Sequence, residues 1–268
     1  MHASSSDDSR PPAETVLITG GSSGIGLELA RCFAVEGCRV VLTARNETAL
    51  LELADELSVA HSVSAVVLPC DLSRPDAPEQ LAEACRQRDL VIDVLVNNAG
   101  FGAHGPVSEI PLERQREMVQ LNTATLIELS RRFLPGMLQR GRGGVLNVAS
   151  TAAFQPGGPY MTVYYASKAF VLSFTEGLAE ELAGTEIHVT CLAPGPVSTE
   201  FGSVAGVEDT AMFKARAMEA SKVAWAGYRG LRRGKTLVVP GVRNKLTTLA
   251  VRLLPRTVIR KTIARIQK

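Results

Sequence analysis

The sequence predicts an α/β protein in which helices cover both faces of a parallel sheet. Short apolar, β-branched runs alternate six times with stretches of helical periodicity, which implies right-handed crossovers between parallel strands. Apolar residues make up 46% of the 268 residues and aromatic residues only 5%. This composition suits helices packed closely on a sheet, and no linker or internal repeat divides the chain, so we expect a single domain.

The expected elements follow from these runs and from the turn residues between them. We place strands at 15–19, 39–44, 64–70, 91–96, 145–149 and 186–192, with an edge strand at 236–240. We place helices at 27–36, 47–57, 77–88, 111–133 and 169–182.

The turn after the first expected strand carries three glycines in the pattern T-G-x-x-x-G-x-G. The missing Cβ atoms allow backbone N–H groups and the start of a helix to approach a pyrophosphate closely. A flexible turn is the alternative, but the order strand, turn, helix favours a dinucleotide site. The residues of this expected binding turn are Gly20, Ser22, Ser23, Gly24, Ile25 and Gly26.

The ends of the next two strands suggest which dinucleotide binds. Arg45 follows the second strand directly, where an acid would hold unphosphorylated ribose hydroxyls. An arginine suits a 2′-phosphate by charge and by its planar donor fork, so we favour NADP(H) over a plain surface role. Asp71 and Leu72 follow the third strand, where Asp71 either accepts from an adenine amino group or caps the next turn.

Two further stretches carry amides in unusual places. Asn97, Asn98, Ala99 and Gly100 follow the fourth strand, where two amides and a glycine can tie neighbouring strands together and form the floor of a cofactor site. Asn122 lies inside a predicted helix, although asparagine competes there for backbone hydrogen bonds. Its apolar neighbours indicate that this part of the helix is buried.

A serine, a tyrosine and a lysine follow the fifth strand. Tyr164 and Lys168 are four residues apart, so on a helix they share one face. A nearby ammonium favours the phenolate, so we expect the pKa of Tyr164 to be lowered and the residue to exchange protons near neutral pH. A hydroxyl at Ser150 could bond the oxygen of a bound carbonyl. For the pair taken alone, a core tyrosine and a solvated lysine are the alternative.

These stretches occur in the order T-G-G-S-S-G-I-G, D-L, N-N-A-G, the mid-helix asparagine, the serine, Y-x-x-x-K and P-G-P-V-S-T. In this order they resemble the short-chain dehydrogenase/reductase family, and the resemblance runs from about Thr15 to Pro240. The resemblance implies a doubly wound, Rossmann-type, seven-stranded parallel sheet and a hydride transfer to or from NADP(H). It implies a catalytic tetrad of Asn122, Ser150, Tyr164 and Lys168. It also implies that Pro194, Val197 and Thr199 flank the nicotinamide, beside the cofactor residues already named.

The resemblance implies a role for each member of the tetrad. Ser150 and Tyr164 would hold the substrate oxygen, and Tyr164 would supply the proton. Lys168 would bind the nicotinamide ribose, and Asn122 would position a water that reaches Lys168. Ser150 precedes Tyr164 by 14 residues where the family commonly has 13, so Thr151 is the alternative for the serine role. We favour Ser150, with the extra residue in the turn at 155–159.

The segment 200–230 is expected to cover the substrate and is rich in apolar side chains. We therefore predict a lipophilic carbonyl or secondary alcohol, such as an acyl chain, a sterol or a terpenoid. A non-redox epimerase or dehydratase and an NADP-sensing binding protein are the alternatives, and the complete Ser–Tyr–Lys set disfavours the sensor. Some of the apolar residues in this segment must simply be core. The residues that suggest this lipophilic cover are Val204, Met212, Phe213, Met218, Trp225 and Tyr228.

The two ends of the chain differ from the expected domain at 14–241. Residues 1–13 are polar and resemble no secretory signal, so we expect a disordered tail. Residues 220–268 contain 13 Lys or Arg and no Asp or Glu, whereas residues 1–219 carry a net charge of −11. The extension at 242–268 is basic and amphipathic, which suits a membrane surface or an acidic partner. Packing on the chain's own acidic surface or on a second subunit is the alternative.

The remaining expectations concern compartment and partners. Five cysteines without a close pair suggest buried free thiols in a reducing compartment, so we expect a cytoplasmic protein, at most associated with a membrane surface. No stretch is apolar enough to span a bilayer. We expect a small-molecule substrate, a homo-oligomer (dimer or tetramer) and no metal site. Nucleic acid is not an expected partner, because no aromatic residues interleave the basic ones.

Overall fold

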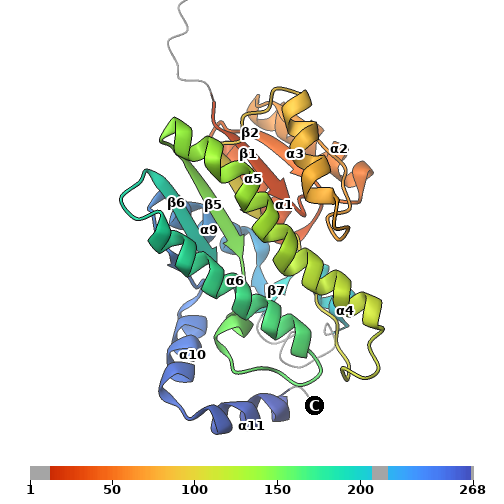
Figure 1. The fold of residues 1–268 in the computed structure, drawn as a ribbon, viewed down its shortest axis with the longest axis vertical. Coiled ribbons are helices and arrows are strands. Elements are labelled where there is room, and N and C mark those ends of the chain that lie inside the picture. The colour runs from red at the N-terminus through yellow and green to blue at the C-terminus, as the bar shows by residue number, and fades with distance from the viewer. Residues whose placement is uncertain (1–12, 207–216, 267–268) are drawn as a thin grey trace, which may run out of the picture.

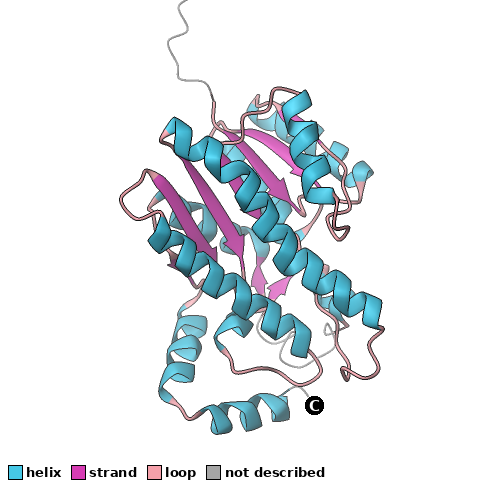
Figure 2. Ribbon diagram, in the orientation of Figure 1, coloured by secondary structure: helices cyan, strands magenta, loops and turns pink. Residues whose placement is uncertain are grey.

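A seven-stranded parallel sheet forms the centre of the molecule in the computed structural model, which describes residues 13–206 and 217–266. The strand order is β3-β2-β1-β4-β5-β6-β9, so the doubly wound parallel sheet predicted from the sequence is confirmed (Figure 2). Its strands are β1 (Thr15–Thr19), β2 (Arg39–Thr43), β3 (Ala65–Val67), β4 (Val94–Asn97), β5 (Gly143–Val148), β6 (Ile187–Leu192) and β9 (Leu237–Val238). A second, two-stranded sheet pairs β7 (Val197–Ser198) with β8 (Met218–Glu219).

The chain leaves β1 toward β3, returns to β4 and then runs toward the other edge. The order therefore reverses between β1 and β4, and their carboxyl ends form the crevice where such sheets bind ligands. Alternation along β1 sets the two layers, because Val16 and Ile18 pack on one face and Leu17 packs on the other.

Helices cover both faces of the sheet (Figure 1). The core that contains Val16 and Ile18 is completed by α1 (Gly24–Val35), α2 (Glu47–His61) and α9 (Ala220–Arg232). The core that contains Leu17 is completed by α3 (Ala77–Gln87), α5 (Thr125–Arg140) and α6 (Thr162–Glu181). The other helices are α4 (Leu112–Val119), α7 (Phe201–Ala205), α10 (Val242–Leu253) and α11 (Arg256–Ile266).

Two element boundaries differ from the sequence expectation in ways that bear on the site. Helix α6 begins at Thr162, so Tyr164 and Lys168 both lie in its first two turns. The helix expected at 111–133 is instead α4, a π-helical turn at Gln120–Ala124 and α5. Helix α5 continues past Pro135, and Met137 beyond the proline is fully buried in the core. Burial of such a side chain stabilises enough to offset much of the cost of a helical proline.

The expected substrate cover at 200–230 is only partly formed by that segment. Trp225 and Tyr228 lie on α9, where the Tyr228 ring packs 5.0 Å from the ring of Phe33 on α1 and 5.6 Å from that of Trp225. These two residues are therefore among the apolar residues of the segment that are core, because they pack between two helices. Met212 and Phe213 lie outside the described residues, as does the expected tail up to residue 12.

Two findings concern the compartment expectations. All five cysteines are free thiols, four of them buried and Cys70 half-buried. Within 13–206 and 217–266, no helix combines the length and the apolarity needed to cross a bilayer.

Candidate active site

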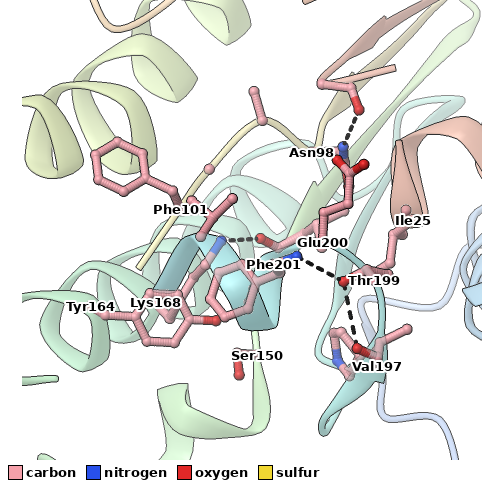
Figure 3. Close-up of a pocket in the computed structure, with 18 of the residues that line it drawn as sticks. Ile25, Asn98, Phe101, Ser150, Tyr164, Lys168, Val197, Thr199, Glu200 and Phe201 are labelled. Atoms are coloured by element: carbon pink, nitrogen blue, oxygen red, sulfur yellow. Dashed lines mark hydrogen bonds between the residues drawn. The ribbon is translucent and has the colours of Figure 1, made fainter. Parts of the chain in front are cut away.

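The carboxyl ends of the strands open on a pocket of about 870 Å³. It extends from the turn after β1 to the first turn of α10, and Figure 3 shows part of its lining. The sequence-predicted site residues that line it are Gly20, Ser22, Ser23, Gly24, Ile25, Arg45, Asp71, Leu72, Asn98, Ala99, Gly100, Ser150, Tyr164, Lys168, Pro194, Val197 and Thr199. Gly26 and Asn122 do not line this pocket, and both lie directly behind it.

The glycine turn is shaped by close backbone contacts. Gly20 and Gly24 have φ of +65° and +56°, a conformation that favours glycine. A Cβ atom on Gly26 would lie 2.1 Å from the carbonyl oxygen of Gly20, so Gly26 allows α1 to pack against the turn. Ser23 precedes α1 without a side-chain capping bond among the described residues. The first backbone N–H groups of α1 therefore lack that acceptor, which suits an anion at this end of the pocket.

Asn98 and Thr19 fasten the glycine turn to β4. The Nδ2 of Asn98 donates to the carbonyl oxygens of Thr19 and Gly20, at 2.9 and 3.1 Å. The Oγ1 of Thr19 accepts from the backbone N–H groups of Asn98 and Ala99, each at 2.9 Å. The turn is thus held rigidly at the crevice, and Thr19 is a residue of the site's framework that sequence reasoning missed.

Arg45 and Asp71 mark the far end of the pocket. Arg45 is exposed beyond the end of β2. Burial of Asp71 would raise its pKa, but hydrogen bonds from Ser73 and the charges of Arg45 and Arg74 hold the pKa below its ordinary value. The Oδ1 of Asp71 accepts from the backbone and the hydroxyl of Ser73, at 3.1 and 2.7 Å, so this carboxylate caps its own turn. Its other oxygen has no hydrogen bond among the described residues, and Asp71 is part of the pocket lining.

Asn122 occupies the π-helical turn between α4 and α5 and is only 2% exposed. Its Oδ1 accepts from the N–H of Phe101 at 3.1 Å, and its Nδ2 donates to the carbonyl oxygen of Phe101 and to Ser167 Oγ, both at 3.0 Å. The amide of Asn122 therefore serves as hydrogen-bond partner for the backbone of Phe101, in the loop after β4. This role explains why an asparagine lies inside a helix. A small cavity of about 10 Å³, on the order of one water, is lined by both Asn122 and Lys168.

Ser150 and Tyr164 meet at the centre of the pocket (Figure 3). The hydroxyl of Ser150 acts on that of Tyr164 and lowers its pKa. Ser150 Oγ also accepts from the N–H of Ala152 at 3.1 Å and so caps the short helix at Thr151–Phe154. Thr151 lines the same pocket, and its backbone N–H donates to Pro194 at 2.8 Å. Of the two candidate hydroxyls, the one that acts on the pKa of the phenol is that of Ser150.

Lys168 lies behind Tyr164 and is almost fully buried. Its Nζ donates to the carbonyl oxygen of Val148 at 2.8 Å and lies 5.9 Å from the centre of the Tyr164 ring. Burial lowers the pKa of Lys168 to about 8, although the nearby Cys191 acts in the opposite direction. Both Tyr164 and Lys168 face the pocket that begins at the glycine turn.

The expectation that the pKa of Tyr164 is lowered is wrong. Burial raises the pKa of Tyr164 to about 12, and the hydrogen bond to Ser150 only partly opposes this. The ammonium of Lys168 sits beside the ring face and is bonded to a backbone carbonyl, so desolvation of the phenolate outweighs any attraction. The phenol is therefore held in its protonated form at neutral pH.

Asn97, one of the two amides expected to tie neighbouring strands together, belongs to a buried amide network whose other members sequence reasoning missed. Asn97 Nδ2 donates to Asn147 Oδ1 at 2.9 Å and to Ser130 Oγ at 3.3 Å, and Asn147 Nδ2 donates to Thr175 Oγ1 at 3.0 Å. The network joins β4, β5, α5 and α6. The signal in the sequence was an asparagine within each of two otherwise apolar strands.

Apolar side chains form the wall next to Tyr164. Phe101, Met161 and Phe201 pack with the phenol, and the Phe201 ring lies 5.3 Å from the Tyr164 ring. Val204 and Met218 line the pocket as expected from the sequence. Phe101 and Phe201 were missed, although Phe101 directly follows the N-N-A-G stretch and Phe201 lies two residues after the P-G-P-V-S-T stretch. The wall suits an apolar group placed beside the phenol.

The residues present fit a nicotinamide dinucleotide. A glycine-rich turn, a helix N-terminus and an arginine line the same pocket as the phenol and ammonium groups. Within the described part of the chain, no group of three or more His, Cys, Asp or Glu side chains could hold a metal ion.

Comparison with known proteins supports this description. The family model for short chain dehydrogenases matches residues 14–209. The ketoacyl reductase HetN of Nostoc sp. is 31% identical over 244 residues, which cover 91% of this chain and 80% of the relative. A short-chain dehydrogenase from Sphingobium yanoikuyae, solved in complex with NADPH, has a TM-score of 0.80 at 33% identity and covers 88% of this chain and 92% of its own. A 7β-hydroxysteroid dehydrogenase has a TM-score of 0.84 at 25% identity and covers 93% of this chain and 96% of its own.

Proposed function

We propose, from the premise that this chain belongs to the short chain dehydrogenase family, that it transfers a hydride between NADP(H) and a lipophilic ketone, aldehyde or secondary alcohol. The observation that carries the proposal is that Ser150, Tyr164 and Lys168 share one pocket with the glycine turn after β1. A sensor of the cofactor would need the turn but no proton donor.

Each polar side chain has a task that follows from its position. The nicotinamide, when bound, donates or accepts the hydride. Ser150 and Tyr164 hold the substrate oxygen between their hydroxyls, and Tyr164 carries the proton that this oxygen gains or loses. Lys168 donates hydrogen bonds near the ribose, and Asn122 fixes the loop that carries Gly100 and Phe101. The buried amide network keeps these groups in place.

The preference for the phosphorylated cofactor rests on Arg45. It is exposed beyond β2, in the same pocket as Asp71, and no acidic side chain takes its place. A guanidinium pairs with a phosphate in a bidentate way, whereas an acid at this position would repel it. The NADPH complex of the similar Sphingobium yanoikuyae dehydrogenase agrees with this preference.

The lipophilic substrate class rests on the wall beside Tyr164. Phe101, Met161, Phe201 and Val204 present apolar surface where the group attached to the carbonyl would lie. The similarity to a hydroxysteroid dehydrogenase and to a ketoacyl reductase points to substrates with extended hydrocarbon parts.

The protein also acts as a homo-oligomer in this proposal. Ile127 on α5 and Phe170 on α6 are exposed large apolar side chains on one helical layer, and Phe170 stacks on Phe174 at 5.9 Å. A second copy that packs on this layer would cover them. The free cysteines suit a reducing compartment, so we place the protein in the cytoplasm.

The decisive experiment follows the oxidation of NADPH by absorbance with a panel of medium-chain and cyclic carbonyls. We expect Tyr164→Phe to lower kcat by about 100-fold or more while NADPH binding, measured by its fluorescence, is kept. Tyr228→Phe is the matched control, because Tyr228 lies on α9 outside the pocket, and it should keep its activity. Tight NADPH binding without turnover of any carbonyl would instead indicate a cofactor-sensing protein.

A further inference from the structure

Helix α10 presents four of its large apolar side chains outward. Val242, Leu246, Leu249 and Leu253 are 73%, 62%, 54% and 77% exposed, and their spacing of four, three and four residues places them on one face. We call these four residues the leucine stripe. The opposite face is directed inward: Thr248 is buried, and Asn244 Nδ2 donates to the carbonyl oxygen of Pro240 at 2.7 Å. The usual arrangement of a surface helix is thus reversed.

Basic side chains border the leucine stripe on both sides. At 100° per residue, Lys245 and Arg252 lie on one flank of the stripe and Arg243 on the other, and all three are exposed. Among the described residues, none of these three side chains forms an ion pair with a carboxylate. No acidic residue occurs after Glu219 in the whole sequence. Helix α10 therefore carries a net positive charge, and its three basic side chains are not paired with carboxylates of the described residues.

Helix α11 adds charge at the same end of the molecule. Its Ile259 and Ile263 are buried, so α11 packs back through its own apolar face. Its exposed basic side chains are Arg256, Arg260, Lys261 and Arg265. Figure 1 shows α10 and α11 beyond the carboxyl ends of the strands, on the side away from the N-terminus. Leu254 and Val258, at the junction of the two helices, are also about half exposed.

We propose that the leucine stripe of α10 docks on the surface of an anionic lipid bilayer. In an interfacial helix the apolar face sinks to the level of the acyl chains, while long Lys and Arg side chains on its borders reach the lipid phosphates. Basic residues near the membrane attract such a segment to anionic lipids over about one Debye length. The stripe, its basic borders and the added charge of α11 match these requirements together.

A protein partner fits this face less well. The stripe belongs to one helix of 12 residues, whereas a stable protein interface buries about 800 Å² on each partner. Such interfaces also depend on aromatic and arginine anchors that fill pockets, and the stripe holds only leucine and valine. An acidic protein could pair with the basic residues, but such pairing alone would leave the leucine side chains exposed to water.

The stripe adjoins the mouth of the pocket. Val242, its first member, lines the pocket together with Arg243, Asn244 and Thr247. A docked α10 would therefore hold the entrance of the site at the lipid surface. This consequence rests on the proposed function: a lipophilic carbonyl dissolved in the bilayer would reach Tyr164 without crossing bulk water.

The test is sedimentation of the full-length protein with phosphatidylcholine vesicles, with and without phosphatidylglycerol. We expect the wild type to bind the anionic vesicles and to be released as ionic strength rises. The variant Leu246→Gln/Leu249→Gln/Leu253→Gln should bind at least about tenfold more weakly, because its stripe can no longer enter the acyl region. Val242 is kept because it lines the pocket. The matched control Val35→Gln/Leu51→Gln/Val59→Gln alters three exposed apolar side chains on α1 and α2 and should bind as the wild type does.

The result separates this inference from the proposed enzyme function. Vesicle binding needs no turnover, and oxidation of NADPH with a water-soluble carbonyl should be equal in the stripe variant and the wild type. Failure of the wild type to sediment with anionic vesicles, or equal binding by the stripe variant, would overturn the inference. It would be overturned as well if the stripe variant changed the oligomeric state, because a second copy would then be the occupant of the stripe.

Discussion

Replacing Asn122 with alanine tests whether the π-helical turn is held by side-chain hydrogen bonds. The amide of Asn122 makes three bonds in a site that is 2% exposed, to the N–H and the carbonyl of Phe101 and to Ser167. Ser167 keeps a second bond, from its Oγ to the carbonyl of Tyr164. The substitution therefore leaves two buried backbone groups of Phe101 without their partners.

Each orphaned backbone group costs about 1–3 kcal/mol, so two cost about 2–6 kcal/mol. Water that enters the vacated volume would recover part of this, since a small cavity lies beside the side chain. We expect Asn122→Ala to lower the free energy of unfolding by about 3 kcal/mol. Urea unfolding followed by circular dichroism, at one protein concentration for all variants, would measure the change.

Thr123→Ala is the matched control in the next position of the same turn. It removes a hydroxyl that bonds within its own helix to the carbonyl of Val119, and it should change stability by less than about 1 kcal/mol. A loss for Asn122→Ala no larger than that of Thr123→Ala would refute the reasoning. The turn would then be maintained by helix packing alone.

Three further predictions concern the pocket. The pKa of Lys168 is about 8 in the folded protein and 10.5 ordinarily, so the unfolded chain binds more protons between these values. The free energy of unfolding of the wild type should therefore rise by about 2 kcal/mol from about pH 8 to pH 10. Lys168→Met should lack this rise when both proteins are compared by urea unfolding. Stability from Lys168 is thus lost as the pH falls toward 8, and a parallel pH profile of the two proteins would contradict the burial of an ionisable lysine. Ser150→Ala should lower kcat by about 100-fold, whereas Thr151→Val should change it by less than about tenfold. The reverse ranking would assign the serine role to Thr151. Arg45→Ala should raise the KM for NADPH about tenfold and leave that for NADH nearly unchanged, and an equal effect on both would remove Arg45 from the phosphate site.

The backbone of the site could be read from the sequence because local chemistry fixes it. Gly20 and Gly24 take positive φ values that few other residues tolerate, so the pattern specifies the turn almost by itself. The strands were visible because both faces of a parallel sheet are buried and their runs are apolar. Asn122 stood out as a residue out of place in a helix, and the structure shows which backbone groups it serves.

The wrong predictions concern properties that depend on burial and on tertiary contacts, which the spacing of residues in the sequence does not reveal. The four-residue spacing of Tyr164 and Lys168 placed them on one face, but it did not show how deeply the phenol is buried or that the ammonium bonds Val148. Desolvation therefore reversed the expected direction of the pKa shift. The sequence also did not show which apolar residues of the segment 200–230 are core, and α9 packs Trp225 and Tyr228 toward α1.

Helix α10 shows how the sequence could have indicated its reversed orientation. A helix with one face in the core normally carries charges on the opposite face, because that face meets water. In α10 the face opposite the leucine stripe holds Asn244, Thr248 and Val251, none of them charged, and the basic residues are confined to the two flanks. Neither of the two opposed faces is therefore built for bulk water. The face with Asn244 and Thr248 packs on the protein. The face with the leucine stripe requires an apolar neighbour, and this is the physical basis for placing α10 between the active site and a bilayer.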